Sequence, residues 1–151
     1  MPDLYIITGA NGAGKSSLGY NYLPQSIQES YPVFDGDKLF VQKQKELWNS
    51  GIKAYKEARR LAYEFVTDTF DHLVEEALAA NDNFVYEGHF TNDATWDIPG
   101  KFKSRGYSIN LTFLGLTDPD TSLNSTPSPP PPSSPPSPQT AVLSNRSTDI
   151  I

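Results

Sequence analysis

The chain of 151 residues contains no cysteine. This absence excludes disulfide bonds, thiolate metal sites and cysteine nucleophiles, and it agrees with a reducing compartment. Basic side chains are also scarce, since 12 Lys and Arg stand against 18 Asp and Glu for a net charge of −6. A broad nucleic-acid-binding surface needs clustered basic side chains, so we expect no nucleic-acid partner.

Long hydrophobic runs are lacking as well. The apolar stretches have the length of strands, well short of the roughly 20 residues that span a bilayer. The first residues show no basic segment followed by an apolar run, which is the pattern of a secretory signal. We therefore expect no membrane partner and a cytoplasmic location.

Composition changes sharply near residue 121. Residues 121–151 contain eight of the thirteen prolines and almost no charge. Proline lacks the amide donor of a helix, and this stretch has too few apolar side chains to offset the entropy of ordering. We expect a folded domain over 1–120 and a disordered Pro/Ser-rich tail over 121–151, with a polyproline ligand as the alternative reading of the tail.

Strand and helix patterns alternate along residues 1–120. Short apolar or β-branched runs predict strands at 3–8, 31–35, 81–88 and 107–116. Helical patterns lie between them, at about 14–22, 38–48, 53–80 and 93–104. This alternation predicts parallel βαβ crossovers and an α/β sandwich of three layers, with a mostly parallel sheet covered on both faces.

The carboxyl ends of the predicted strands carry the residues of chemical interest. These ends are Gly9, 35–37, 87–90 and 116–118. In an open parallel sheet the carboxyl ends lie at one edge, where ligands gather. We expect the functional site at this edge.

The turn after the first strand, ITGANGAGKSS, matches the phosphate-binding pattern G-x-x-x-x-G-K-[ST]. Glycines allow a tight turn whose amides point at phosphate oxygens, and the following helix adds its positive end. Lys15 is expected to reach the β- and γ-phosphates of ATP or another nucleoside triphosphate, and Ser16 to ligate Mg²⁺. The residues expected to bind the nucleotide are Gly9, Ala10, Asn11, Gly12, Ala13, Gly14, Lys15, Ser16 and Ser17. The alternative is a glycine-rich turn with an incidental lysine.

Acidic residues at two other strand ends are candidates for the acceptor side of the site. Asp35 and Asp37 follow the second predicted strand, where alternate residues face one side. A carboxylate there can accept the proton of a substrate hydroxyl during phosphoryl transfer. We assign Asp35 to helix capping and Asp37 to chemistry. Glu87 is expected to organise the acceptor or a metal-bound water, and His89 either contacts substrate or packs in its loop.

Three segments, YIITGANGAGKSS, VFDGDKLF and FVYEGHFTN, together resemble the zeta-toxin family of P-loop kinases over roughly residues 3–122. The resemblance implies ATP-dependent phosphorylation of the sugar 3′-hydroxyl of UDP-N-acetylglucosamine, and an antitoxin as a protein partner. It also implies that Asp37 is the catalytic base, Glu87 the active-site acid, and Lys15 and Ser16 the nucleotide and metal positions. His89 stands where the toxins often have threonine, which bears on the identity of the substrate.

The family pattern is not followed after about residue 122. In the family a helical lid with arginines for the phosphates follows the fourth strand, and a fifth strand and a final helix come next. Here the only basic residue of the tail is Arg146. Because such an arginine contributes about 10³-fold or more in rate, we expect a truncated or frame-shifted member with impaired transfer. Two alternatives stay open: an ATPase or nucleotide switch without an acceptor, and a non-catalytic fragment.

Overall fold

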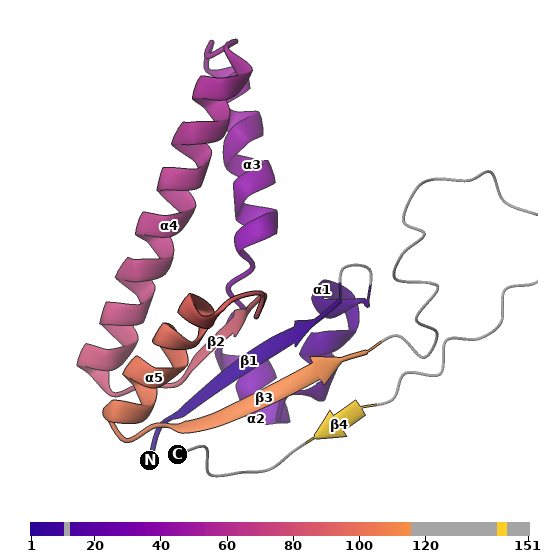
Figure 1. The fold of residues 1–151 in the computed structure, drawn as a ribbon, viewed down its shortest axis with the longest axis vertical. Helices are drawn as coiled ribbons and strands as arrows, with labels where there is room; N and C mark the ends of the chain where they lie inside the picture. Colours follow the sequence, from indigo (N-terminus) through magenta and orange to yellow (C-terminus); the bar gives the residue numbers. More distant parts are fainter. Residues whose placement is uncertain (11–12, 116–141, 145–151) are drawn as a thin grey trace, which may run out of the picture.

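The computed structural model describes residues 1–10, 13–115 and 142–144, which form an α/β fold (Figure 1). In this part of the chain the sheet has four strands in the order β2-β1-β3-β4. The strand bounds are β1 Asp3–Gly9, β2 Phe84–Glu87, β3 Ser108–Leu114 and β4 Val142–Ser144. β1 pairs in parallel with β2 and β3, whereas β4 is antiparallel to β3. The predicted α/β class with a mostly parallel sheet is therefore confirmed.

Helices and two short 3-10 helices connect the strands. Their bounds are α1 Lys15–Leu18, η1 Gly19–Tyr22, α2 Gln25–Ser30, α3 Gly36–Asn49, α4 Tyr55–Ala80, η2 Asp93–Trp96 and α5 Asp97–Ser104. α3 and α4 pack against each other as a hairpin that extends away from the sheet (Figure 1). Among the described residues, no helix has both the length and the hydrophobicity that crossing a bilayer requires.

Alternation along β1 divides the core between the two faces of the sheet. Leu4 and Ile6 belong to one buried cluster, which also holds side chains of α4, α5 and β2. Ile7 belongs to a second cluster with Leu23 and Ile27, on the side of η1 and α2. Successive side chains of a strand point to opposite faces, so β1 is covered on both. This is the three-layer arrangement that the sequence predicts.

The predicted strand at 31–35 is wrong in its extent. Only Phe34 pairs, through a parallel bridge to Tyr86 of β2, and its amide and carbonyl each form a 2.9 Å hydrogen bond with that strand. Pro32 has no amide to donate, and Asp35 already begins α3 as its N-cap residue. The bridge nevertheless brings the start of α3 to the carboxyl end of β2.

The sequence pattern does not predict α2, because Pro24 indicates the end of a helix. In the structure Pro24 instead stands at the N-cap of α2, where its carbonyl accepts from the Ile27 and Gln28 amides at 2.9 and 3.0 Å. Proline suits the start of a helix, since the amide it lacks would have no partner within the helix. Ile27 then anchors α2 in the second cluster.

Most of the predicted tail, 121–151, lies outside the described residues, so its disorder stays a prediction. Within it, Val142–Ser144 form β4, whose register pairs Leu143 with Phe113 of β3. The composition of the tail does not predict this strand. Such pairing depends on the edge of β3, which is distant in the sequence.

Candidate active site

The carboxyl end of β1 forms the glycine-rich turn that the sequence predicts. Gly9 has φ +147°, and a Cβ there would lie 2.1 Å from the Leu114 carbonyl oxygen, so the turn needs glycine where it passes β3. Gly14 has φ +82° and stands at the N-cap of α1. Two of the predicted nucleotide-binding residues, Asn11 and Gly12, lie outside the described residues.

Lys15 is buried at the start of α1, with 8% of its surface exposed. Its Nζ donates to the carbonyl oxygens of Gly9 and Ala10, at 3.0 and 3.1 Å. The ammonium group is thus held against the backbone of the turn by neutral acceptors. A phosphate would be a stronger partner, because hydrogen bonds between charged groups are stronger than those to neutral ones.

Ser16 joins three segments that are far apart in the sequence. Its Oγ lies 3.3 Å from Asp35 Oδ2 and 3.3 Å from Glu87 Oε2, and its single proton is donated to one of them at a time. A hydroxyl and two carboxylates are hard oxygen donors of the kind that Mg²⁺ prefers. The residues at this point therefore fit the magnesium ion that accompanies nucleoside triphosphates.

Asp35 both caps a helix and approaches the hydroxyl group of Ser16. Its Oδ1 accepts from the Lys38 amide at 3.0 Å and caps the N-terminus of α3, as the sequence predicts, while its Oδ2 faces Ser16. Ser17, by contrast, donates its hydroxyl to the Gly14 carbonyl at 3.3 Å, which braces the first turn of α1. The phosphate contact of Ser17 stays a prediction.

Asp37 and His89 meet across the site. Asp37 lies in the first turn of α3 with 85% of its side chain exposed, and His89 follows the end of β2. The Nε2 of His89 lies 3.2 Å from Oδ2 of Asp37. The structure thus places Asp37, the predicted base, next to His89. The sequence predicts that His89 either contacts substrate or packs in its loop.

Glu87 ends β2 and is half-buried. Burial raises its pKa above the ordinary value, and the Asp35 carboxylate raises the pKa further, while the Ser16 hydrogen bond and the Lys15 charge act in the opposite direction. A half-buried carboxyl next to a second carboxylate is typical of functional sites, where such pKa shifts cluster.

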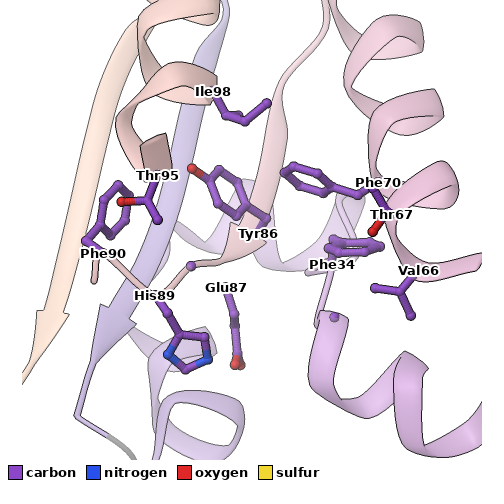
Figure 2. Close-up of a pocket in the computed structure, with 12 residues that line it drawn as sticks. Phe34, Val66, Thr67, Phe70, Tyr86, Glu87, His89, Phe90, Thr95 and Ile98 are labelled. Carbon is purple, nitrogen blue, oxygen red and sulfur yellow. The ribbon is translucent and has the colours of Figure 1, made fainter. Parts of the chain in front are cut away.

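A cavity of about 290 Å³ opens beside these carboxylates (Figure 2). Its lining is mostly apolar and includes Phe34, Val66, Phe70, Tyr86, Phe90 and Ile98. No sequence pattern predicts a function for these apolar side chains, although Glu87 and His89, which line the same cavity, are predicted site residues. Val66 and Phe70 lie on the apolar stripe of the long helix, and such a stripe indicates core packing. In the structure the Phe70 ring contacts the rings of Phe34 and of Tyr86 in β2, with centroids 5.0 and 5.3 Å apart, which places this part of the stripe beside the site.

A glycine-rich turn at the end of a central parallel strand, with acidic residues at the neighbouring strand end, is the arrangement of the P-loop fold. The family model of the zeta toxin matches residues 1–128, and the chain belongs to the zeta-toxin family. The resemblance that the three sequence motifs predict is thereby confirmed. No curated protein matches the chain.

Two solved structures share the fold. One comes from the PezAT chromosomal toxin–antitoxin system of the human pathogen Streptococcus pneumoniae, with 22% identity, a TM-score of 0.63 and coverage of 82% of this chain and 50% of that one. The other is a candidate kinase from Chloroflexus aurantiacus, with 15% identity, a TM-score of 0.51 and coverage of 73% and 57%. The chain thus spans half the length of the first structure and 57% of the length of the second.

Proposed function

We propose that this chain is an ATP-dependent phosphotransferase of the zeta-toxin type, which moves the γ-phosphoryl group of ATP to a hydroxyl group of a small molecule. The observation that carries the proposal is the 3.3 Å approach of Glu87 at the end of β2 to Ser16 in the phosphate-binding turn. This contact joins the residue expected at the metal to the strand end that borders the cavity. Phosphoryl donor and acceptor would therefore meet at this point.

Lys15 and the backbone amides of the turn would hold the phosphates of ATP. The Lys15 ammonium is bonded to the Gly9 and Ala10 carbonyls, so it has to exchange these acceptors for phosphate oxygens. The exchange is favourable, because negatively charged phosphate oxygens attract the ammonium group more strongly than neutral carbonyl oxygens do. Ser16 would ligate Mg²⁺, which neutralises charge on the phosphates when it is bound.

Asp37 would act as the general base. The acceptor hydroxyl gives its proton to the Asp37 carboxylate while its oxygen bonds to the γ-phosphorus, and the bond from that phosphorus to the β,γ-bridging oxygen breaks to release ADP. Because 85% of the Asp37 side chain is exposed, the proton can pass on to water. Glu87 would hydrogen-bond the same hydroxyl, and His89 would hold Asp37 in place.

The family resemblance suggests a nucleotide sugar or a similar small metabolite as the acceptor. Similarity to a structure from a toxin–antitoxin system suggests an antitoxin as a partner. Because ATP is the proposed phosphoryl donor, the proposal implies a cytoplasmic protein.

Nucleotide binding is tested first, by the melting temperature of the protein with and without Mg-ATP. A ligand that binds only the folded state at about 100 times its Kd stabilises it by about 2.7 kcal/mol, which raises the melting temperature. Lys15→Ala should abolish this shift. Lys45→Ala, the same change at an exposed position on α3, should keep it. A shift that survives Lys15→Ala would reject the phosphate-binding assignment.

Transfer is tested by mass spectrometry after incubation with Mg-ATP and a metabolite mixture that includes UDP-N-acetylglucosamine. The expected product is a compound heavier by one phosphoryl group, formed by the unaltered protein and lost in Asp37→Asn. Asp93→Asn, at an exposed position in η2, is the matched control. Phosphate release that neither acceptors nor Asp37→Asn change would instead identify an ATPase or a nucleotide switch.

A further inference from the structure

Basic side chains gather where the α3–α4 hairpin is farthest from the sheet (Figure 1). This part of the chain, residues 43–60, is called the hairpin end below and comprises the last turns of α3, the connecting loop and the first turns of α4. It holds six of the twelve Lys and Arg but only two of the eighteen Asp and Glu, which gives it a net charge of +4. Since the whole chain carries −6, the rest of the chain carries −10. The hairpin end is therefore a basic surface on an acidic protein.

Part of this basic surface is a groove on the first turns of α4. The groove is lined by Lys56, Arg59, Arg60, Tyr63 and Glu64. Lys56 precedes Arg59 and Arg60 by three and four positions, so the three basic side chains lie on one face of the helix. Lys56 and Arg59 are exposed, and Nη1 of Arg59 lies 3.5 Å from the neutral hydroxyl of Tyr55. This contact leaves the positive charge of Arg59 uncompensated.

Arg60 is instead held by carboxylates of its own helix. Its guanidinium forms ion pairs with Glu57 at 2.7 Å and with Glu64 at 2.6 Å. The three side chains are 54%, 48% and 53% exposed, and ion pairs at such exposure contribute little to stability. A carboxylate from another molecule can therefore replace one of these partners at little cost. Arg60 adds a second guanidinium to the surface that Arg59 offers.

Exposed aromatic side chains stand among these charges. Trp48, Tyr55 and Tyr63 are 47%, 61% and 68% exposed. Lys53 donates its ammonium to the Trp48 carbonyl at 2.7 Å and lies 4.6 Å from the centroid of the Trp48 ring, which holds this pair together at the loop. Tryptophan, tyrosine and arginine are the residue types enriched at the energetic centres of protein–protein interfaces. The composition of the hairpin end thus favours a protein as its partner.

We propose that the hairpin end binds an acidic segment of a partner protein, whose carboxylates pair with Lys56, Arg59 and Arg60. A guanidinium group matches a carboxylate in geometry as well as in charge. A nucleic acid fits less well, because a strand that continued past the hairpin end would meet the −10 charge of the rest of the chain. The two glutamates paired with Arg60 also interrupt the basic surface that a continuous row of phosphates requires.

The test measures binding of the full chain to labelled deca-glutamate by fluorescence anisotropy at low ionic strength, where charges are weakly screened. Deca-glutamine has the same length without the charge and should not bind. Deca-uridylate, with the same dye, represents a nucleic acid and should bind more weakly than deca-glutamate. Added salt should weaken the binding of deca-glutamate, since the contacts are between exposed charges.

A charge reversal assigns the binding to the groove. Arg59→Glu replaces an attractive charge by a repulsive one and should weaken deca-glutamate binding roughly tenfold. Arg105→Glu is the matched control, because Arg105 is an exposed arginine at the end of α5 and its replacement changes the total charge equally. It should weaken binding by roughly twofold or less, through the change in overall charge alone.

A second substitution should strengthen binding. Glu57→Gln removes one of the two carboxylates that occupy Arg60, so deca-glutamate should bind roughly threefold more tightly. Glu76→Gln, the same change at an exposed position near the other end of α4, should alter binding much less. Because a gain in affinity cannot arise from loss of the fold, this pair decides the question even where Arg59→Glu fails to fold.

The inference is overturned if deca-glutamate does not bind at low ionic strength, or if each variant affects binding as much as its control does. Tighter binding of deca-uridylate than of deca-glutamate, lost in Arg59→Glu, would assign the surface to a nucleic acid. A dimer in sedimentation velocity that Arg59→Glu dissociates would assign it to a second copy of this chain. Both results contradict the proposal. No nucleotide is added, so the outcome does not depend on the proposed phosphotransferase activity.

Discussion

His89 Nε2 lies 3.2 Å from Asp37 Oδ2, although 52 positions separate the two residues in the sequence. Asp37 belongs to the first turn of α3, and His89 to the loop after β2. The Asp37 side chain is largely exposed, and in the described part of the chain this contact is the hydrogen bond that restrains its carboxylate. We interpret His89 as a positioning residue for the proposed base.

Replacement of His89 should affect transfer without affecting nucleotide binding. We expect His89→Ala to lower kcat roughly tenfold, because an unrestrained carboxylate spends less time aligned with the acceptor hydroxyl, while the Kd for Mg-ATP stays the same. His89→Gln carries an amide that can reach the same carboxylate, so it should recover part of the loss. Steady-state kinetics and calorimetry measure both quantities. His72→Ala, at an exposed position on α4, is the control, and equal losses in the two His89 variants would contradict the positioning role.

Glu87 should make the stability of the protein depend on pH. Burial, and then the Asp35 charge, raise its pKa in the folded protein above the ordinary value, so folding takes up a proton between the two pKa values. The contribution of this proton to stability is fully present below the ordinary pKa, and it is lost as pH rises through the raised pKa. Glu87→Gln, which does not ionise, should therefore gain stability relative to the unaltered protein as pH rises from about 4 to about 7.

Urea unfolding at several pH values, without divalent cations, measures this trend as the slope of stability against pH. The same pair of proteins is then compared in an Asp35→Asn background, where one cause of the raised pKa is absent. In the Asp35→Asn background, the slope of stability against pH should differ less between the Glu87→Gln variant and the protein that keeps Glu87. A stability difference that stays constant with pH would contradict the prediction.

Gly9→Ala should destabilise the fold strongly. The backbone at Gly9 has φ +147°, and the added Cβ would lie 2.1 Å from the Leu114 carbonyl oxygen, so both strain and a clash with β3 oppose the change. We expect a loss of roughly 3 kcal/mol or more in urea unfolding. Gly51→Ala is the matched control, because Gly51 has φ +108° but no atom within 4 Å of the added Cβ, and it should lose only roughly 1–2 kcal/mol. Equal losses would show that the contact with β3 is unimportant.

Phe102 should be the more costly of two phenylalanines to truncate. It is fully buried in α5, stacked on Phe84 at 5.8 Å and edge-on to Tyr107 at 4.8 Å. Phe102→Ala removes these contacts and leaves a cavity, so the free energy of unfolding should fall by about 3–5 kcal/mol. Phe113→Ala in β3, where 49% of the residue is exposed, should lose about 1 kcal/mol. Thermal or urea unfolding decides between these values, and similar losses would contradict the assignment of the core.

Much of the fold was predictable because its determinants are local. The long helix shows a continuous apolar stripe, and α4 lies at Tyr55–Ala80, within the predicted 53–80. The phosphate-binding turn depends on glycines and a following helix, which act over a few residues. The strand at 31–35 and the helix α2 were exceptions. Pro32 and the early start of α3 leave Phe34 to pair, and Pro24 begins α2 where it was expected to end a helix.

Contacts between distant segments were beyond prediction. Neither the bond of His89 to Asp37 nor the pairing of β4 with β3 has a local pattern, since each depends on where another part of the chain lies. The cavity lining is a similar case. Phe70 has the spacing of a core residue in the long helix. Its place in the cavity wall depends on Phe34 and Tyr86, which come from other segments and pack beside it.

Local sequence therefore determines the phosphate-binding turn, the long helix and the acidic strand ends, because backbone preferences and side-chain periodicity act over short distances. The tertiary structure alone decides that Asp35 and Glu87 both approach Ser16, and that an apolar cavity lies beside them. The physical reason is the parallel pairing of β1 with β2, together with the bridge from Phe34. These contacts bring together chain segments that are far apart in the sequence, and no local pattern in those segments indicates that they pair.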